Sequence, residues 1–419
     1  MLQIMLALGG TTSSLSPAYA QVGIQTQIVL DGRSFALSTR EARALSTLRE
    51  SIPGGRHAIQ DAALEAARNA TDSPDARYLF AVYALEIGRQ RSDTMLRAEA
   101  LDILIARGIA PQVKLASYLG VRGGIAFERG DFATARQLWT RMLGMKPGDA
   151  DVLANLAQVE QAQNNPKGAA ELIARAIVAR KASGQRAAEL WYRQWLSAAN
   201  QASLVSEASA AGLALVAAYP SARNWHDALV VYRQLAAPKD GLEIDWLRFS
   251  RRVGGFTKAA EYQRLAQLLE HEGVNAEAKA VLAEGLSDAI LRPDESPTRD
   301  IIAEVERAMT VQAGGLPAPA RPGSGGGSAA QSQAADRLFG MGRYSDAATL
   351  YRAALNGPTA ESGRLNTRLG MALSAAGLGL EAQAAFRSAA AAAGSGYADL
   401  ARFWLAWLAQ GDAPASAAS

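Results

Sequence analysis

The strongest constraint on the fold is a repeat with a period of about 34 residues. Three positions of one segment recur one period later with residues of similar size: Gly123, Ala135 and Leu143 return as Ala157, Ala169 and Ile177. A fixed period of this length is typical of stacked helix pairs, in which each pair buries its apolar face on the next pair. The sequence therefore predicts an elongated array of helix pairs in place of a single core.

The segment 130–149 shows what one repeat contains. Gly130-Asp131 breaks one helix, an apolar face at helical spacing predicts a second helix over about 133–145, and Pro147-Gly148 ends it. The apolar face consists of Ala135, Leu138, Trp139, Met142 and Leu143. An earlier helix carries Leu115, Leu119, Gly123 and Phe127, and the small Gly123 allows close approach of its partner.

A second region near the carboxyl end has the same spacing. Gly342, Tyr344, Ala347, Tyr351 and Ala354 match the spacing of the first copy. Gly377, Ala382, Phe386 and Ala389 then repeat four of these positions, and Gly370 stands where Gly123 stood. An alanine-rich helical bundle with accidental periodicity is the alternative, and two separate pairs with coincident spacing argue against it.

These residues resemble the tetratricopeptide repeat family, whose pattern is a small residue in helix A, then alanine, an aromatic residue and alanine in helix B, often followed by proline. Residues 116–183 and 328–396 match well, while 273–285 and 215–235 match in part. The signature residues are Gly123, Ala135, Trp139, Pro147, Ala157, Ala169, Ala347, Tyr351, Gly370, Ala382 and Phe386. The resemblance implies an all-α tetratricopeptide-like α-solenoid, to which the sequence adds a short N-terminal β-hairpin.

The hairpin and the linker follow from local patterns. Residues 23–37 alternate about Asp31-Gly32, a two-residue turn signal. The segment 313–334 is rich in Gly, Pro and Ser without apolar periodicity, which predicts a flexible tether between two arrays. The predicted organisation is a signal peptide at 1–20, a hairpin at 21–38, degenerate helical repeats at 39–112, an array at 113–312, the linker at 313–334, a second array at 335–411 and a disordered tail at 412–419.

The start of the chain suggests where the protein works. A short apolar stretch is followed by Ala18-Tyr19-Ala20, and small residues at these positions suit cleavage by a signal peptidase. A positive segment before the apolar stretch is missing, because the first basic residue is Arg33. We expect a periplasmic protein, or a cytoplasmic one if this segment is not a signal peptide. The chain has no cysteine, so it carries neither a disulfide nor a lipidated cysteine.

Several classes of function lack support in the sequence. His57, His226 and His271 stand alone without a second metal ligand at helical spacing, so no metal site is predicted. No phosphate-binding loop or nucleophile elbow occurs, and we expect neither an enzyme nor a cofactor. The net charge of +3 gives no basis for a nucleic-acid surface, and no apolar run is long enough for a transmembrane helix.

The paired tryptophans leave two interpretations. Trp191 and Trp195 lie one turn apart, and Trp404 lies near Trp407. A platform for stacking sugars uses such pairs, but packing between helices uses them more often, and we favour the core.

The resemblance also implies candidate binding residues on helix A. Arg364, Arg368 and Arg402 occupy groove positions of the C-terminal array, and guanidinium groups there favour an acidic peptide or a free carboxylate. Asn155 occupies a position where the family contacts a peptide backbone. The family's full carboxylate clamp is absent, because Ser332 and Asp336 stand at two of its positions and Gly120 and Gly124 at others. The alternative is that these arginines are ordinary solvated charges.

The expected function is a non-enzymatic scaffold that binds a peptide or partner protein in the concave groove of its repeats. One alternative is a periplasmic scaffold subunit of an envelope polysaccharide export or secretion machine. Another is a glycan-binding or accessory domain of an envelope enzyme. The partner, the biological process and the oligomeric state are left open by the sequence.

Overall fold

The computed structural model describes residues 26–30, 33–106, 111–313, 327–357, 359, 361–392 and 396–411. Over these residues the chain forms twenty α-helices and one two-stranded sheet, which confirms the predicted all-α solenoid with an N-terminal hairpin. The chain divides into two compact units, Met1–Ser183 and Gly184–Ser419. The predicted signal peptide at 1–20, the turn at 31–32 and the tail at 412–419 lie outside the described residues.

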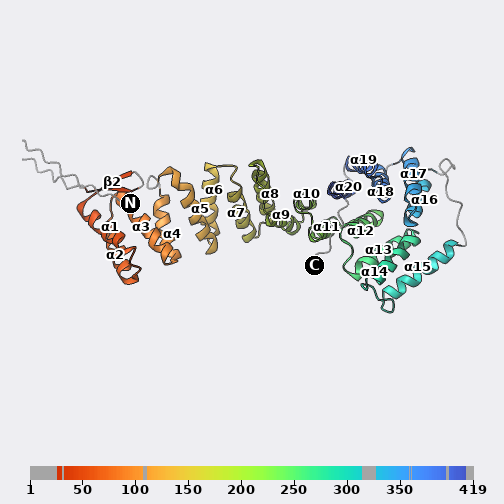
Figure 1. The fold of residues 1–419 in the computed structure, drawn as a ribbon, viewed down its shortest axis with the longest axis horizontal. Helices are drawn as coiled ribbons and strands as arrows, with labels where there is room; N and C mark the ends of the chain where they lie inside the picture. Colours follow the sequence, from red (N-terminus) through yellow and green to blue (C-terminus); the bar gives the residue numbers. More distant parts are fainter. Residues whose placement is uncertain are drawn as a thin grey trace, which may run out of the picture. The chain divides into compact units, whose positions relative to one another are not determined.

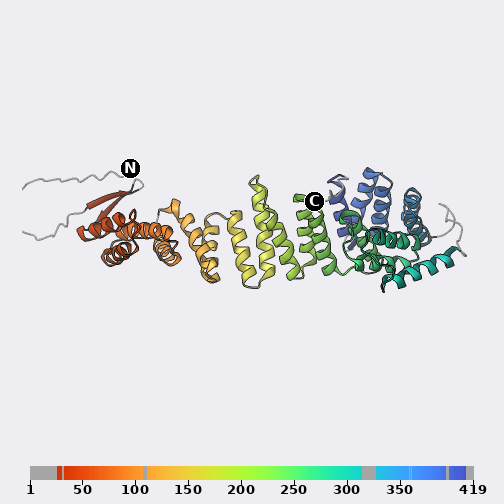
Figure 2. The ribbon, with the colours of Figure 1, turned by 60° about the horizontal axis from the view of Figure 1, so that its bottom comes forward.

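The first unit consists of the hairpin and eight helices, drawn from red to yellow-green in Figure 1. Their bounds are β1 (Thr26–Leu30), β2 (Arg33–Leu37), α1 (Thr39–Ser51), α2 (His57–Ala70), α3 (Pro74–Gln90), α4 (Thr94–Ile105), α5 (Gln112–Glu128), α6 (Phe132–Met145), α7 (Ala150–Ala162) and α8 (Pro166–Ala182). Consecutive helices pair as α1 with α2, α3 with α4, α5 with α6 and α7 with α8, and Figure 2 shows these pairs stacked along the unit. The first helix of each pair is helix A and the second is helix B.

The hairpin forms in the predicted register and packs on the first helices. Leu30 pairs with Arg33 across the turn, and Thr26 pairs with Leu37 at the open end. Phe35 is buried and stacks on Tyr78 of α3 with ring centroids 5.3 Å apart. This packing supplies the burial that an isolated two-stranded hairpin lacks.

The predicted small-to-aromatic interlock joins helix A to helix B in the α5–α6 repeat. A Cβ atom on Gly123 of α5 would lie 2.4 Å from the indole nitrogen of Trp139 on α6, so only glycine fits there. Pro147 lies in the turn between α6 and α7, which agrees with its predicted role as a helix stop. Ala135, Ala157 and Ala169 are buried at the same seams.

Ala135→Leu is expected to destabilise the first unit by roughly 1–3 kcal/mol, because overpacking forces side chains and backbone to shift. Ala135 is fully buried and packs in the cluster around Trp139. Chemical denaturation followed through the indole N–H resonance of Trp139 would measure the loss. Ala133→Leu, at an exposed position of the same helix, is the matched control, and equal stability of the two variants would place Ala135 away from the seam.

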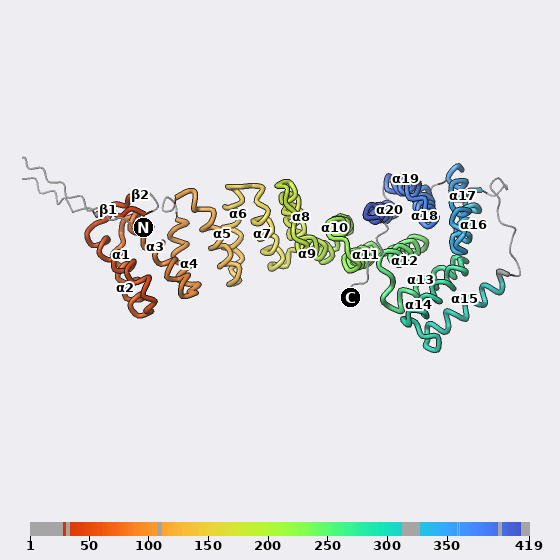
Figure 3. Tube along the Cα trace, in the orientation of Figure 1, coloured from red at the N-terminus to blue at the C-terminus, as the bar shows by residue number. Residues whose placement is uncertain are grey.

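The second unit contains twelve helices, drawn from green to blue along the tube in Figure 3. Their bounds are α9 (Glu189–Gln201), α10 (Val205–Ala218), α11 (Ala222–Ala236), α12 (Asp240–Gly254), α13 (Ala259–His271), α14 (Asn275–Ser287), α15 (Thr298–Ala313), α16 (Ser328–Gly340), α17 (Tyr344–Leu355), α18 (Ser362–Ala375), α19 (Gly379–Ala390) and α20 (Gly396–Leu408). The predicted interlock recurs here, because a Cβ atom on Gly370 of α18 would lie 2.7 Å from the ring of Phe386 on α19. Ala347, Tyr351 and Ala382 are fully buried as the signature requires.

The C-terminal array is docked and not tethered, which corrects the predicted organisation. Helix α20 packs on α10 and α12, and α16 packs on α14. The Asp399 carboxylate of α20 accepts hydrogen bonds from Ser209 of α10 at 3.1 Å and from Tyr232 of α11 at 2.7 Å. Phe403 lies fully buried against Trp246 of α12 with ring centroids 5.4 Å apart. The two predicted arrays therefore share one core within residues 184–419.

The predicted domain boundaries change accordingly. Helix α16 begins at Ser328, inside the predicted linker of 313–334, and residues 314–326 lie outside the described residues. The boundary between the two units falls after Ser183, inside the predicted array of 113–312. Composition located the break in helical pattern after α15, but it contains no information on which helices the following segment packs against.

Cutting the chain between α15 and α16 is expected to leave one complex. Cleavage at a protease site placed within residues 314–326 would break the covalent connection between α20 and its partner helices. Buried aromatic packing and the Asp399 hydrogen bonds should still hold the two fragments together. The cut fragments should co-elute with the uncut protein in size-exclusion chromatography. Separate elution of two folded fragments would restore the tethered organisation.

Candidate binding surfaces

Arg368 does not lie in an open groove, which corrects its predicted role. It is 4% exposed on α18, and its guanidinium group lies between two carboxylates. Nε donates to Asp245 of α12 at 2.8 Å, and Nη1 donates to Asp336 of α16 at 2.7 Å. A partner's carboxylate cannot reach this group without displacing the docked helices.

The other two predicted arginines also have partners within the chain. Arg364 forms ion pairs with Glu361 and, at 3.8 Å, with Asp336, and its side chain is about one-fifth exposed. Arg402 is half-exposed and pairs with Asp399 at 2.8 Å. The structure thus brings Arg364 and Arg368 together with Asp336, but uses them for docking of helices within the second unit.

A buried charge network surrounds Arg368. Arg248 of α12 bonds to Asp245 at 2.8 Å and to both carboxylate oxygens of Glu277 on α14 at 2.9 and 2.5 Å. Burial alone would lower the pKa of Arg368, but the carboxylates of Asp245 and Asp336 raise that pKa well above its ordinary value. Asp245 was not found from the sequence, because it is 123 positions away and belongs to no motif.

The helix A face of the first unit carries an apolar hollow. Its cavity measures about 590 Å³, within the size range of ligand-binding pockets. The lining residues come mainly from β1, α1, α3 and α5, and we call this surface the helix A hollow: Leu30, Arg49, Ile52, Val82, Tyr83, Leu85, Glu86, Arg89, Arg97 and Val121. Val121 is 41% exposed, so apolar surface is open to a partner at this point.

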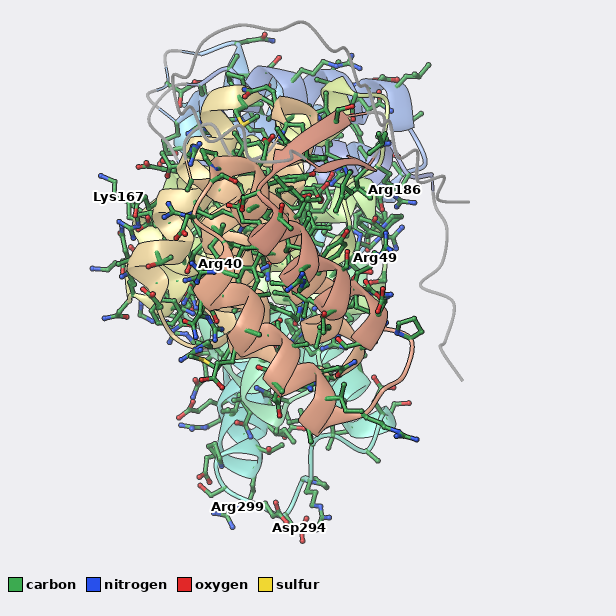
Figure 4. The ribbon with its side chains drawn as sticks, turned by 90° about the vertical axis from the view of Figure 1, so that its left-hand side faces the viewer. Arg40, Arg49, Lys167, Arg186, Asp294 and Arg299 are labelled. Carbon is green, nitrogen blue, oxygen red and sulfur yellow. The ribbon has the colours of Figure 1, made fainter. Side chains whose placement is uncertain are left out.

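Two arginines of the helix A hollow differ from those of the C-terminal array. Arg49 and Arg97 are half-buried, and within the described part of the chain neither guanidinium group donates a hydrogen bond or forms an ion pair. Arg89 is paired with Glu86 at 2.9 Å. Figure 4 looks at this end of the chain, with Arg40 and Arg49 of α1 labelled on opposite sides of the view. This pair cannot be recognised in the sequence, because neither arginine falls at a motif position.

Asn155 lies on α7, which is helix A of the repeat that follows α5 and α6. Its side chain is half-buried and makes no hydrogen bond within the residues that the structure covers. Asn155 therefore keeps both its amide donor and its acceptor for another molecule, as a contact to a peptide backbone requires. Its predicted role is untested.

The two tryptophan pairs differ in burial. Trp404 and Trp407 of α20 are buried, as favoured from the sequence. Trp191 and Trp195 of α9 are half-buried, and Trp195 donates to Glu207 at 3.1 Å. In the described segments, no three His, Asp or Glu side chains gather as metal ligands, and none of the helices found there is long and apolar enough to cross a bilayer.

A comparison with known protein families locates the repeats in the sequence. The family model described as tetratricopeptide repeat matches residues 126–190. This range runs from the end of α5 through α6, α7 and α8 to the start of α9. No curated protein matches the chain in sequence.

Several solved structures are similar to this chain. The C-terminal part of a tetratricopeptide repeat protein from Cytophaga hutchinsonii has 13% identity and a TM-score of 0.34, over 62% of this chain and 99% of that one. The TPR2AB domain of yeast Sti1, in a complex with pHSP90, has 13% identity and a TM-score of 0.26, over 71% and 99%. A tetratricopeptide repeat protein from Parabacteroides merdae has 12% identity and a TM-score of 0.23, over 79% and 99%.

The family match and the buried seam residues fall in the same stretch of the chain. The matched segment contains Ala135, Trp139, Ala157 and Ala169, which the structure buries at the seams between helices. Residues 126–190 of this chain match the tetratricopeptide repeat family model, and the helix pairs in this stretch pack as that family's pattern predicts.

Proposed function

We propose that the protein is a scaffold that binds a peptide, or an exposed segment of a partner protein, at the helix A hollow of the first unit. Stacked repeats present extended surfaces for such segments, and they need no catalytic group to do so. The observation that carries the proposal is the combination, at one place, of open apolar surface with the unpartnered guanidinium groups of Arg49 and Arg97.

The charge of the helix A hollow favours an acidic segment. Its lining contains Arg49, Arg89 and Arg97 but only one carboxylate, Glu86, which Arg89 already occupies. A carboxylate from a partner would give Arg49 and Arg97 the ion pair that the chain does not supply. Apolar side chains of the same segment would fill the space between Val82 and Val121.

A photo-crosslinking amino acid at Val121 tests the location of the site. In cells, this position should yield one dominant crosslinked partner. The matched control is Val178 on α8, which is a helix B position and is 67% exposed. Crosslinking of the same partner with equal yield from Val178 would contradict a site on the helix A face.

The chemistry of the site is tested with peptides from the crosslinked segment. The double variant Arg49→Gln and Arg97→Gln should bind the peptide at least about tenfold more weakly, since hydrogen bonds to charged groups contribute about 1.5–3 kcal/mol each. Arg175→Gln, on the exposed face of α8, is the control. Unchanged affinity in the double variant would exclude an acidic ligand at this hollow and direct the search to Asn155.

The compartment is part of the proposal. The Ala18-Tyr19-Ala20 pattern supports export to the periplasm, where the scaffold would serve an envelope assembly. Mass spectrometry of the protein purified from cells tests this: removal of residues 1–20 supports export, and an intact N-terminus in the cytoplasmic fraction contradicts it.

A further inference from the structure

The N-terminal hairpin, drawn as red arrows in Figure 2, has an open edge along β1. Because two residues join the strands, Leu30 and Arg33 form a hydrogen-bonded pair, and pairs with and without hydrogen bonds then alternate along the hairpin. Val29 and Ser34 form a pair without hydrogen bonds, so the backbone N–H and C=O groups of Val29 point away from β2. In the described part of the chain, these two groups of Val29 have no hydrogen-bond partner.

The opposite edge of the hairpin is covered by α3. Ala36 of β2 also belongs to a pair without hydrogen bonds, and its N–H group donates to the Asp75 carboxylate of α3 at 3.0 Å. This bond supports the alternation, because the N–H group of Ala36 reaches α3 only if it points away from β1. β2 also packs on α1 and α3. The open edge of the hairpin is therefore that of β1.

β1 has none of the features that keep edge strands from pairing with another chain. Its sequence, TQIVL, contains no proline and no charged residue. Val29 is 48% exposed, whereas Ile28 and Leu30 pack on the core of the first unit. The strand thus presents backbone groups without partners beside an apolar inner face, and proteins bind extended peptides at such edges by adding a strand.

The open edge of β1 leads into the helix A hollow. Along α3, Tyr78 packs on β2, and Arg89, three turns further on, lines the hollow. Leu30, at the end of β1, belongs to the same lining. A chain that pairs with β1 and continues past Leu30 therefore enters the hollow. There the guanidinium groups of Arg49 and Arg97 form no ion pair within the residues that the structure describes.

We propose that the segment bound at the helix A hollow is an extended strand that pairs with the open edge of β1. Its backbone bonds to Val29, and acidic side chains of the part that continues past Leu30 pair with Arg49 and Arg97. Because the side chains of a strand alternate between two faces, only every second residue of the segment faces the protein. This inference rests on the proposed function and specifies the conformation of the segment. A second copy of the chain fits less well, because β1 itself contains no carboxylate.

The probes are peptides selected from a phage-displayed library of random linear sequences on the immobilised full chain. A selected peptide is kept if it loses affinity for the double variant Arg49→Gln and Arg97→Gln, which locates it at the hollow. It is then synthesised with one backbone N-methyl group at a time. Methylation at alternate residues of the strand should weaken binding at least about tenfold, because it removes donors to β1. Methylation at the residues between them should change the affinity by less than about twofold.

These measurements distinguish failure of the binding site from failure of the added strand. If no selected peptide depends on Arg49 and Arg97, the hollow does not bind acidic segments and both proposals are wrong. If peptides depend on these arginines but the effect of N-methylation does not alternate, the hollow is a binding site and the added strand is wrong.

Val29→Pro tests the edge of β1 directly. Proline removes an N–H group that the hairpin does not use and places its ring where the added strand would lie, so a selected peptide should bind at least about tenfold more weakly. The matched control is Ser34→Pro, which makes the same change at the cross-strand neighbour, on the other edge, and should keep the affinity within about twofold. Neither substitution removes a hydrogen bond of the hairpin, so both variants should keep the melting temperature of the wild type.

Two results with these variants would overturn the proposal. One is an equal loss of affinity in Val29→Pro and Ser34→Pro. The other is a dimer of the full chain, seen in analytical ultracentrifugation, that Val29→Pro dissociates, because the edge would then bind a second copy. If Val29→Pro lowers the melting temperature, the N-methyl series on the unchanged protein decides.

Discussion

Arg368→Ala is expected to lower the free energy of unfolding of the second unit by roughly 3–5 kcal/mol, because removal of one partner leaves buried charges without compensation. The substitution leaves the fully buried Asp245 with Arg248 as its remaining ion-pair partner, and it deprives Asp336 of its closest ion pair. Six of the seven tryptophans lie in the second unit, so urea denaturation followed by tryptophan fluorescence reports mainly on it. The same variant should release the C-terminal helices when the chain is cut between α15 and α16.

The control for this experiment is one turn away on the same helix. Arg364→Ala removes an arginine whose main partner, Glu361, is exposed, so the loss should stay below about 1 kcal/mol. The sequence alone predicts that both arginines lie in an open groove. In that case, neither substitution would change the stability by much. If the Arg364 and Arg368 substitutions lowered the free energy of unfolding by equally small amounts, Arg368 would have to lie at the surface, which would contradict the buried network.

The contrast between these arginines shows how much of the site can be predicted from the sequence. The family resemblance assigned Arg364, Arg368, Ser332 and Asp336 to groove and clamp positions, and the structure brings these residues together. Local period predicts contacts within a repeat and to the next one, because a solenoid repeat touches only its neighbours. Asp245 reaches Arg368 from a repeat far away in the chain, where no period relates the two.

The same limit explains why the sequence did not predict that the C-terminal array is docked. The Gly, Pro and Ser composition after α15 correctly located the end of one helical pattern, but a break in pattern does not determine whether the flanking helices touch. Asp399 meets Ser209 across 190 positions, and the contact depends on polar and aromatic side chains that no local motif requires. The helix A hollow was missed for a related reason, since Arg49 and Arg97 become notable only through the absence of partners in three dimensions.

Local signals were most successful at the helix starts of the first unit. The stretch Ser38-Thr39-Arg40-Glu41 is typical of a capping box, and both hydrogen bonds of that box are present. The sequence did not show that Glu41 also caps α3. Its second carboxylate oxygen accepts hydrogen bonds from the backbone N–H groups of Asp72, at 3.2 Å, and of Ser73, at 2.8 Å. One carboxylate thus joins the beginnings of two helices under the hairpin.

Glu41→Gln is therefore expected to lower the free energy of unfolding of the first unit by about 2 kcal/mol near neutral pH, after allowance for solvent screening at the helix ends. Burial raises the pKa of Glu41, but the hydrogen bonds from Ser73 and Ser38 outweigh it and hold the pKa at about 2, below its ordinary value of 4.5. Glutamine keeps the shape and one acceptor, but it turns an NH2 group toward backbone donors.

The effect of Glu41→Gln has a defined dependence on pH. Because the pKa of Glu41 is lower in the folded protein than its ordinary value of 4.5, the ionised carboxylate stabilises the fold fully above that value, and this stabilisation is lost as the pH falls toward 2. Denaturation of the wild type and the variant should differ most at about pH 7, and more than half of the difference should be gone at about pH 3. Glu65→Gln on the exposed face of α2 is the matched control and should show no such trend. A difference between wild type and Glu41→Gln that stays constant over this range would mean that the lost packing, and not the charge of Glu41, holds the two helix starts together.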